Sequence, residues 1–158
     1  MIDTTNSDIV RVLEEHEEVI GSLYAAFADC LPQMGDFWRK LAAQEKAHAD
    51  VLRSLRKRLE FHGVMLNTRK FNRQAVQTSL GFIRQLLERI PREPMTPVRA
   101  LSLAADYEQA MIEKDFFAVF ESDAAEMKRD FQALRNHTAR HRKLILERLE
   151  AEKRGTSP

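Results

Sequence analysis

The sequence has little of the residues that mark disulfide-rich, thiolate-metal or β-sheet proteins. It contains one cysteine, Cys30, in 158 residues. A single thiol excludes an internal disulfide, and it excludes a zinc or iron site built from four thiolates of one chain. Glycine and proline number only five each. The chain is instead rich in Leu, Ala, Glu, Lys and Arg, so the composition predicts an all-α protein.

Two other features are missing, an excess of charge of one sign and a long apolar run. The 25 Lys and Arg residues nearly balance the 24 Asp and Glu residues, for a net charge of +1. This balance gives no indication of a nucleic-acid or membrane partner. No apolar run approaches membrane-spanning length, and the polar N-terminus does not resemble a signal peptide. We therefore expect a cytoplasmic protein with a single domain over residues 1–158.

Apolar residues spaced by threes and fours predict five helices. Thr96 followed by Pro97 is a strong helix start, and Asp123 with Glu126 fits a capping box. Pro32 forbids continuation of the first helix. The predicted helices cover residues 8–31, 36–61, 73–90, 97–121 and 123–153.

The lengths of the connections predict how the helices are arranged. Short links join the first helix to the second and the last two to each other. The stretch from residue 62 to 95 is much longer than a turn needs, and it contains the additional helix 73–90. A ferritin-like four-helix bundle has this connectivity, in which a long crossover stands between two short links. This bundle is the predicted fold.

The second predicted helix carries an apolar stripe with two polar interruptions. Its members, spaced by threes and fours, are Trp38, Leu41, Glu45, His48, Leu52, Leu55 and Leu59. Burying a carboxylate costs several kcal/mol unless its charge is compensated. Glu45 and His48 therefore indicate a wet interior, a partner charge or a metal ion on the facing helices.

The other three long helices have polar interruptions at corresponding places. These are Glu17, Glu108, and Thr138 with His141. Carboxylates and imidazoles that converge inside a bundle are a ligand set for iron, manganese or zinc. The predicted metal ligands are Glu17, Glu45, His48, Glu108 and His141.

A reading without metal stays open, because these groups could pair among themselves, Glu45 with His141 for example. A metal is favoured because a buried ion pair is a weak reason to keep so many charges. Tyr24 and Trp38 are interpreted as core residues rather than redox relays, and Cys30 as a small buried hydrophobe. The residues off the stripes are interpreted as surface: His16, His62, His137, Glu14, Glu15 and Glu18.

At the level of motifs, the chain resembles the rubrerythrin-like family. Glu17-x6-Tyr24 and Phe37-Trp38-x-x-Leu41-Ala42-x-x-Glu45-x-x-His48-Ala49 are similar to the first half of such a domain. Ala100-Leu101-x-x-Ala104-x3-Glu108 through His141 is similar to the second half. The resemblance implies ferritin-like topology and iron chemistry with peroxide, oxygen or ferrous iron. It also implies an external electron donor and is compatible with a homodimer.

The chain departs from this family pattern in two places. Thr138 stands where the family has a bridging glutamate, and there is no cysteine-rich rubredoxin module. Three carboxylates offer about −3 against +4 for two divalent ions, so we expect one tightly held iron, or two of unequal affinity. Manganese or zinc are alternatives to iron. An enzyme of this kind would be an oxidoreductase of peroxidase or ferroxidase type, and the alternative is a non-catalytic bundle that serves interaction or assembly.

Overall fold

The computed structural model describes residues 4–62, 71–117 and 125–155. These residues form five α-helices and no strand, which confirms the all-α prediction for this part of the chain. No helix within it is long and apolar enough to cross a membrane. The helices are α1 (Thr4–Cys30), α2 (Gly35–His62), α3 (Arg73–Arg89), α4 (Pro97–Glu113) and α5 (Ala125–Lys153), with 3-10 turns at Pro32–Met34 and Ile90–Arg92.

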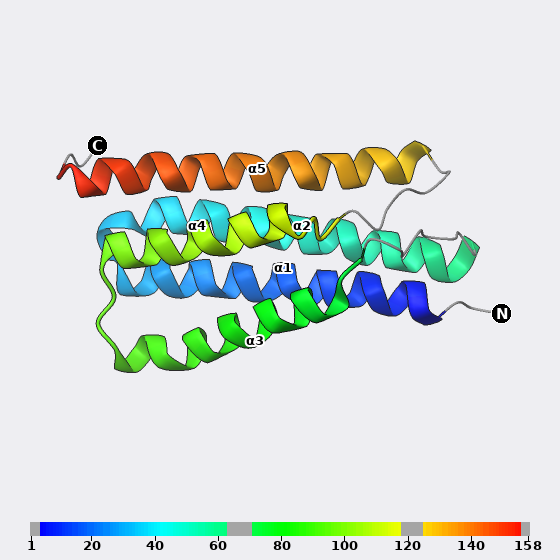
Figure 1. Ribbon diagram of the computed structural model, residues 1–158, viewed down its shortest axis with the longest axis horizontal. Coiled ribbons are helices and arrows are strands. Elements are labelled where there is room, and N and C mark those ends of the chain that lie inside the picture. Colours follow the sequence, from blue (N-terminus) through cyan, green and yellow to red (C-terminus); the bar gives the residue numbers. More distant parts are fainter. Residues whose placement is uncertain (1–3, 63–70, 118–124, 156–158) are drawn as a thin grey trace.

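The long helices lie side by side along the long axis of the molecule (Figure 1). The chain reverses between α1 and α2, which pack closely against each other, and α4 packs against α5. The additional helix α3 packs on α1. By comparison the α1–α2 pair and the α4–α5 pair approach each other sparsely, as the few close backbone contacts between α2 and α5 show.

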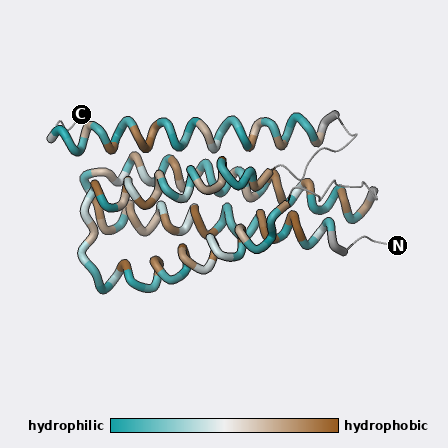
Figure 2. The backbone as a smooth tube through the Cα atoms, in the orientation of Figure 1, coloured by the Kyte–Doolittle hydropathy of each residue, from teal (hydrophilic) through white to brown (hydrophobic). Residues whose placement is uncertain are grey.

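The helices form where the apolar spacing predicts them, because each buries one stripe. In Figure 2 hydrophobic residues recur among hydrophilic ones along every helix. The predicted stripe of α2 is buried from Trp38 to Leu59, including its two polar members. The predicted start of α4 is confirmed, since the Thr96 side chain accepts a hydrogen bond from the Arg99 backbone N–H at 3.2 Å. Asn72 caps α3 in the same way through the Ala75 N–H at 3.0 Å.

The ends of two helices differ from the prediction. Helix α1 begins at Thr4, and α4 ends at Glu113 instead of continuing to residue 121. After α4 the chain turns through Asp115, whose φ of 40° lies in the left-handed region that Asp tolerates better than most residues. This turn buries Phe116 and Phe117. The predicted capping box of Asp123 with Glu126 falls outside the residues whose side chains are described.

Three residues have a different exposure from the one predicted. Cys30 is exposed, because it is the last residue of α1 and lies off the buried stripe. Glu14 is buried, because two arginines of α2 cover it, with Arg53 Nε at 2.9 Å and Arg56 Nε at 3.1 Å from its carboxylate. His16 is buried too, because α3 lies over it, and its Nε2 is 2.8 Å from Ser79 Oγ. The His62 side chain lies outside the described part.

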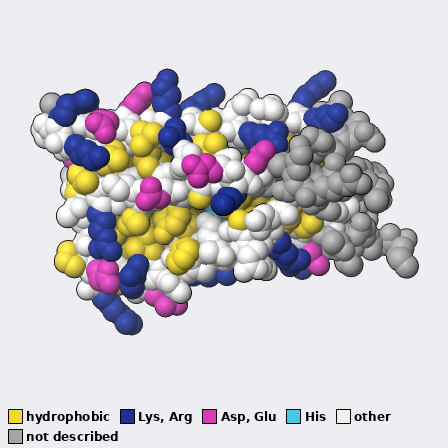
Figure 3. Space-filling model, viewed as in Figure 1, with side chains coloured by type: hydrophobic (Ala, Val, Ile, Leu, Met, Phe, Trp, Pro, Cys, Tyr) yellow, Lys and Arg dark blue, Asp and Glu magenta, His cyan; other side chains and the backbone are white. Residues whose placement is uncertain are grey.

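Apolar surface shows between the charged side chains over α3 and α4 (Figure 3). Phe82 of α3 is 59% exposed, and Val98 and Ile112 of α4 are also exposed. Single exposed apolar residues are normal on protein surfaces. This face therefore does not by itself identify a partner.

Candidate metal centre

The structure brings the five predicted ligands together from four helices. Glu17 comes from α1, Glu45 and His48 from α2, Glu108 from α4 and His141 from α5. All five are at most 5% exposed. They form a polar cluster inside the apolar core, at the middle of the helices.

Glu45 is at the centre of this cluster. Its Oε1 lies 2.7 Å from His141 Nδ1, and its Oε2 lies 2.9 Å from His48 Nδ1. His48 is one turn further along α2, whereas His141 reaches across from α5. One carboxylate therefore joins two imidazoles, which includes the Glu45–His141 pair that the sequence left open.

Glu17 and Glu108 flank the central group on opposite sides. Glu17 Oε2 lies 3.8 Å from His48 Nδ1, and Glu108 Oε1 lies 3.7 Å from His141 Nδ1. Both distances are too long for a hydrogen bond. Among the described residues, neither Glu17 oxygen has a hydrogen-bond partner, and Glu108 Oε2 also lacks one. Three buried carboxylate oxygens are thus available to a cation.

Tyr24 takes part in the site, which the sequence reasoning did not predict. It is fully buried, as expected of a core residue, and its hydroxyl donates to Glu108 Oε1 at 2.6 Å. Burial and the negative charge of Glu108 raise the pKa of Tyr24 well above its ordinary value, so it remains a donor. Tyr24 lies on the same stripe as Glu17, seven residues further along α1. This spacing was the sequence feature that indicated a position near the site.

Burial and mutual repulsion change the protonation of the cluster. Burial, and then the negative charge of Glu45, raise the pKa of Glu17 to about 7. Burial alone would lower the pKa of both histidines, but the neighbouring carboxylates outweigh it. The pKa of His48 is raised to about 10 by Glu17 and Glu45, and that of His141 to about 9 by Glu108 and Glu45. Without a metal, both imidazoles are therefore positively charged at neutral pH.

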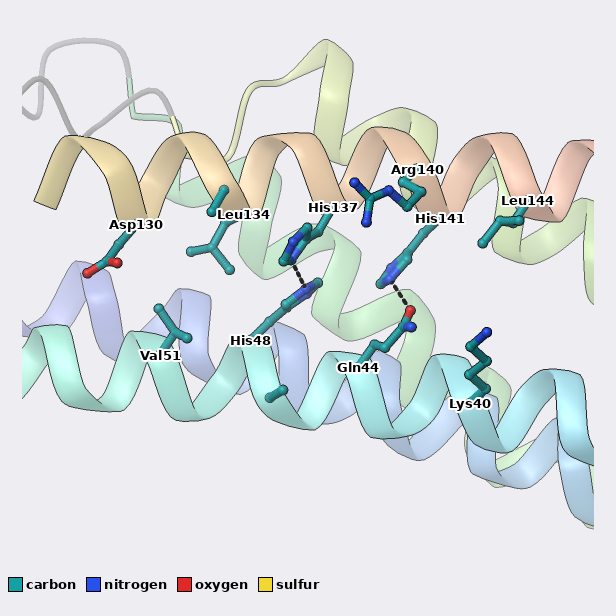
Figure 4. Close-up of a pocket in the computed structure, with 12 residues that line it drawn as sticks. Lys40, Gln44, His48, Val51, Asp130, Leu134, His137, Arg140, His141 and Leu144 are labelled. Atoms are coloured by element: carbon teal, nitrogen blue, oxygen red, sulfur yellow. Dashed lines mark hydrogen bonds between the residues drawn. The ribbon is translucent and has the colours of Figure 1, made fainter. Parts of the chain in front are cut away.

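The outer nitrogens of the two histidines are also occupied (Figure 4). His141 Nε2 donates to Gln44 Oε1 at 2.7 Å, and His48 Nε2 lies 3.1 Å from His137 Nδ1. His137, predicted to be a surface residue, is half-exposed, and its ring also stacks on His48 with centroids 5.1 Å apart. His137 lies four residues before His141 on α5, a spacing that puts both rings on one side of the helix but does not by itself predict the contact with His48. Such contacts fix the ring orientation, here with Nδ1 towards the carboxylates.

Thr138 does not join the cluster through its hydroxyl. Its Oγ1 donates to the backbone carbonyl of Leu134, one turn earlier, at 2.9 Å. Threonines in helices satisfy their hydroxyls in this way without a metal. Thr138 also lines a cavity of about 300 Å³ beside α4 and α5, so there is room next to it for a longer side chain.

Three of the residues meet a geometric requirement for metal binding. Ligand atoms of Glu45, His48 and His141 all lie within 4.8 Å of one another, the only such group in the described part of the chain. Imidazole and carboxylate together suit iron, manganese and zinc. The donor set and the free oxygens of Glu17 and Glu108 therefore fit a divalent cation.

No protein-family model, curated protein or solved structure matches this chain.

Proposed function

We propose that this protein is a rubrerythrin-like, ferritin-like metalloprotein. It binds iron in the buried carboxylate and histidine cluster and uses it in redox chemistry with peroxide, oxygen or ferrous iron. The observation that carries the proposal is the set of three buried carboxylates around two imidazoles, with three carboxylate oxygens unpartnered. A divalent cation would satisfy these three oxygens.

The electrostatics of the cluster support a bound cation. Burying like charges close together is unfavourable, and the raised pKa of Glu17, about 7, reflects first its burial and then the repulsion from Glu45. A divalent ion would displace the protons of the histidines and attract all three carboxylates. The cost of burying the charges would then be offset by coordination.

Each residue has a defined role in this proposal. Glu45, Glu17 and Glu108 would hold the metal through their carboxylates, and His48 and His141 would hold it through Nδ1. Gln44 contacts Nε2 of His141, and His137 contacts Nε2 of His48. Tyr24 orients Glu108 through its hydrogen bond. Bound ferrous iron would supply electrons to the oxidant. A separate electron donor would have to replace those electrons, because the single cysteine of these 158 residues cannot build a four-thiolate redox centre.

A second function is favoured by a different observation. Glu45 is already paired with two imidazoles, and the Thr138 hydroxyl is satisfied by the backbone. A cluster closed in this way can persist without metal. The bundle would then be a non-catalytic descendant that serves interaction or assembly.

Metal analysis separates the two functions. Protein purified without chelators, or loaded anaerobically with ferrous iron, should retain about one metal per chain by elemental analysis, because one bridging carboxylate is absent. His48→Gln should lose it. His16→Gln, a change at a buried histidine outside the cluster, should keep it. No bound metal after ferrous loading would support the non-catalytic function.

The redox part of the proposal needs its own measurement. Ferrous-loaded protein mixed with peroxide should show oxidation of the bound iron, measured by its absorbance. Because each ferrous ion gives one electron and peroxide takes two, two loaded chains should be oxidised for each peroxide that is reduced to water. If the protein binds iron tightly but neither peroxide nor oxygen oxidises that iron, the cluster is a metal site and the redox function is disproved.

A further inference from the structure

A cavity of about 480 Å³ lies between α2 and α5, on the side where these helices touch sparsely. We call it the α2–α5 groove. His48 and His141 line it, but Glu17, Glu45 and Glu108 do not. Figure 4 shows side chains from both helices facing into it. Its volume falls in the range typical of small-molecule sites, about 300–1,000 Å³.

Part of the groove is apolar. Val51 of α2 lines it and is 36% exposed, and Leu144 of α5 lines it and is 40% exposed. Ala47 and Leu134 add apolar surface on the two sides. A ligand with an apolar body would remove this surface from water, which is favourable in proportion to the area buried.

The groove also carries positive charge that the described residues do not neutralise. Lys40 of α2 and Arg140 of α5 line it, and neither forms an ion pair with a described residue. The acidic residue that lines it, Asp130, is bound to Arg58 Nη2 at 2.8 Å. Two cations from opposite sides of one groove are complementary to a negatively charged ligand.

Gln44 adds a polar contact to the floor of the groove. Its Oε1 accepts from His141 Nε2, which leaves its amide N–H groups without a partner among the described residues. Such an amide donates to an oxygen ligand. The polar groups next to the two cations therefore favour an anion with oxygen acceptors.

We propose that the α2–α5 groove binds a small monocarboxylic acid with a short apolar chain. Lys40, Arg140 and the Gln44 amide hold the carboxylate, and the apolar chain packs on Val51 and Leu134. The ligand lies over the outer edges of His48 and His141. Binding does not depend on a metal, so this site goes beyond the proposed function.

The first test is calorimetric titration of the metal-free protein with hexanoate. One saturable site is expected, and hexanamide, which has the same apolar chain without the charge, should bind at least about fivefold more weakly. Lys40→Gln and Arg140→Gln should each weaken hexanoate binding by about fivefold. Lys46→Gln and Lys143→Gln remove charges from the same helices outside the groove and should leave it unchanged.

The second test fills the groove. Ala47→Trp should abolish hexanoate binding. Ala43→Trp is the matched control, because Ala43 is also exposed on α2 but lines a separate cavity of about 450 Å³ that includes residues of α1. Circular dichroism and thermal melting confirm that both variants are folded.

Several outcomes would overturn the proposal. These are no binding of hexanoate by the wild-type protein, equal binding of hexanamide, or equal loss in the control variants. A concentration-dependent dimer that Ala47→Trp disrupts would assign the groove to a second copy of the chain. Because the titrations use metal-free protein, failure here is distinguishable from failure of the metal proposal.

Discussion

At the scale of single residues, the five predicted ligands could be identified because each interrupts a regular apolar stripe. A charged residue at a position that must be buried is conspicuous in the sequence, as Glu45 shows. Contacts made off the stripe were not predictable in this way. Gln44 and His137 meet the site only because α2 and α5 lie at a particular distance and rotation, which the sequence does not specify.

Glu17 gives a prediction in which pH is the variable. Its raised pKa, about 7 against an ordinary 4.5, means that the folded state holds a proton that the unfolded state has lost. Between pH 4.5 and about 7, the stability of the folded state therefore falls as pH rises. In metal-free protein, Glu17→Gln should raise the free energy of unfolding at pH 8 by about 1–3 kcal/mol. At pH 5, where Glu17 is protonated, the gain should disappear.

Urea denaturation of both proteins at the two pH values measures this effect. The same variant should bind metal more weakly, because it removes a carboxylate ligand. A loss of stability at pH 8 would instead show that the charged form of Glu17 has a stabilising partner.

At the scale of secondary structure, four helices could be predicted closely because stripes and caps agreed. The end of α4 was missed for a physical reason. No glycine or proline stands between Lys114 and Phe117 to indicate a turn. Phe116 packs against His16 with ring centroids 5.0 Å apart, and this contact stabilises the turn at Asp115. The contact joins residues far apart in the sequence, so no residue near the turn predicts it.

The contact between α1 and α2 depends on Glu14, which two arginines cover. Glu14→Gln should lower the free energy of unfolding by about 2 kcal/mol, because it removes charge-assisted hydrogen bonds to Arg53 and Arg56. Glu15→Gln is the control, since among the described residues Glu15 makes only a 3.5 Å exposed contact with Arg84. Chemical denaturation of both variants checks the difference. Equal losses would mean that the buried pair is no stronger than a surface pair.

Thr138 tests how completely α5 forms its side of the site. Thr138→Glu places a fourth carboxylate on the stripe, one turn before His141. If it faces the cluster, a second iron should bind more tightly and oxidation by peroxide should accelerate. Without metal it should lower stability, because it adds a buried acid among acids. Thr138→Val controls for loss of the hydroxyl bond to Leu134.

Ferrous titration and thermal melting of the three proteins, with and without metal, measure these effects. If Thr138→Glu melts lower in both states and binds no additional iron, the α5 side of the cluster cannot complete a second metal site.

At the scale of the whole molecule, the cluster joins two halves of the chain. Glu17, Glu45 and His48 belong to the α1–α2 pair, whereas Glu108 and His141 belong to the α4–α5 pair. Each half holds an incomplete ligand set, so the site exists only when the halves pack together. A metal bound there would stabilise the packed arrangement and not merely one helix.

The stability of the whole protein should therefore respond to pH in opposite ways with and without metal. Without metal, His48 and His141 have raised pKa values, about 10 and about 9, against an ordinary 6.5. Their contribution is fully present below pH 6.5 and is lost as pH rises through 9 and 10. The melting temperature of metal-free protein should fall between pH 6.5 and 9.5. His16, whose pKa burial lowers to about 4, does not change charge in this range.

Metal binding should become tighter over the same range, because the cation no longer competes with protons on the imidazoles and on Glu17. The increase in stability from added metal should therefore be larger at pH 8 than at pH 6, and about 2.7 kcal/mol where free metal is a hundred times its Kd. Thermal melts across this range, with calorimetry in buffers of different ionisation enthalpy, measure the stability and the protons released. If the metal-dependent increase does not change with pH, the ion binds without displacing those protons and therefore outside this cluster.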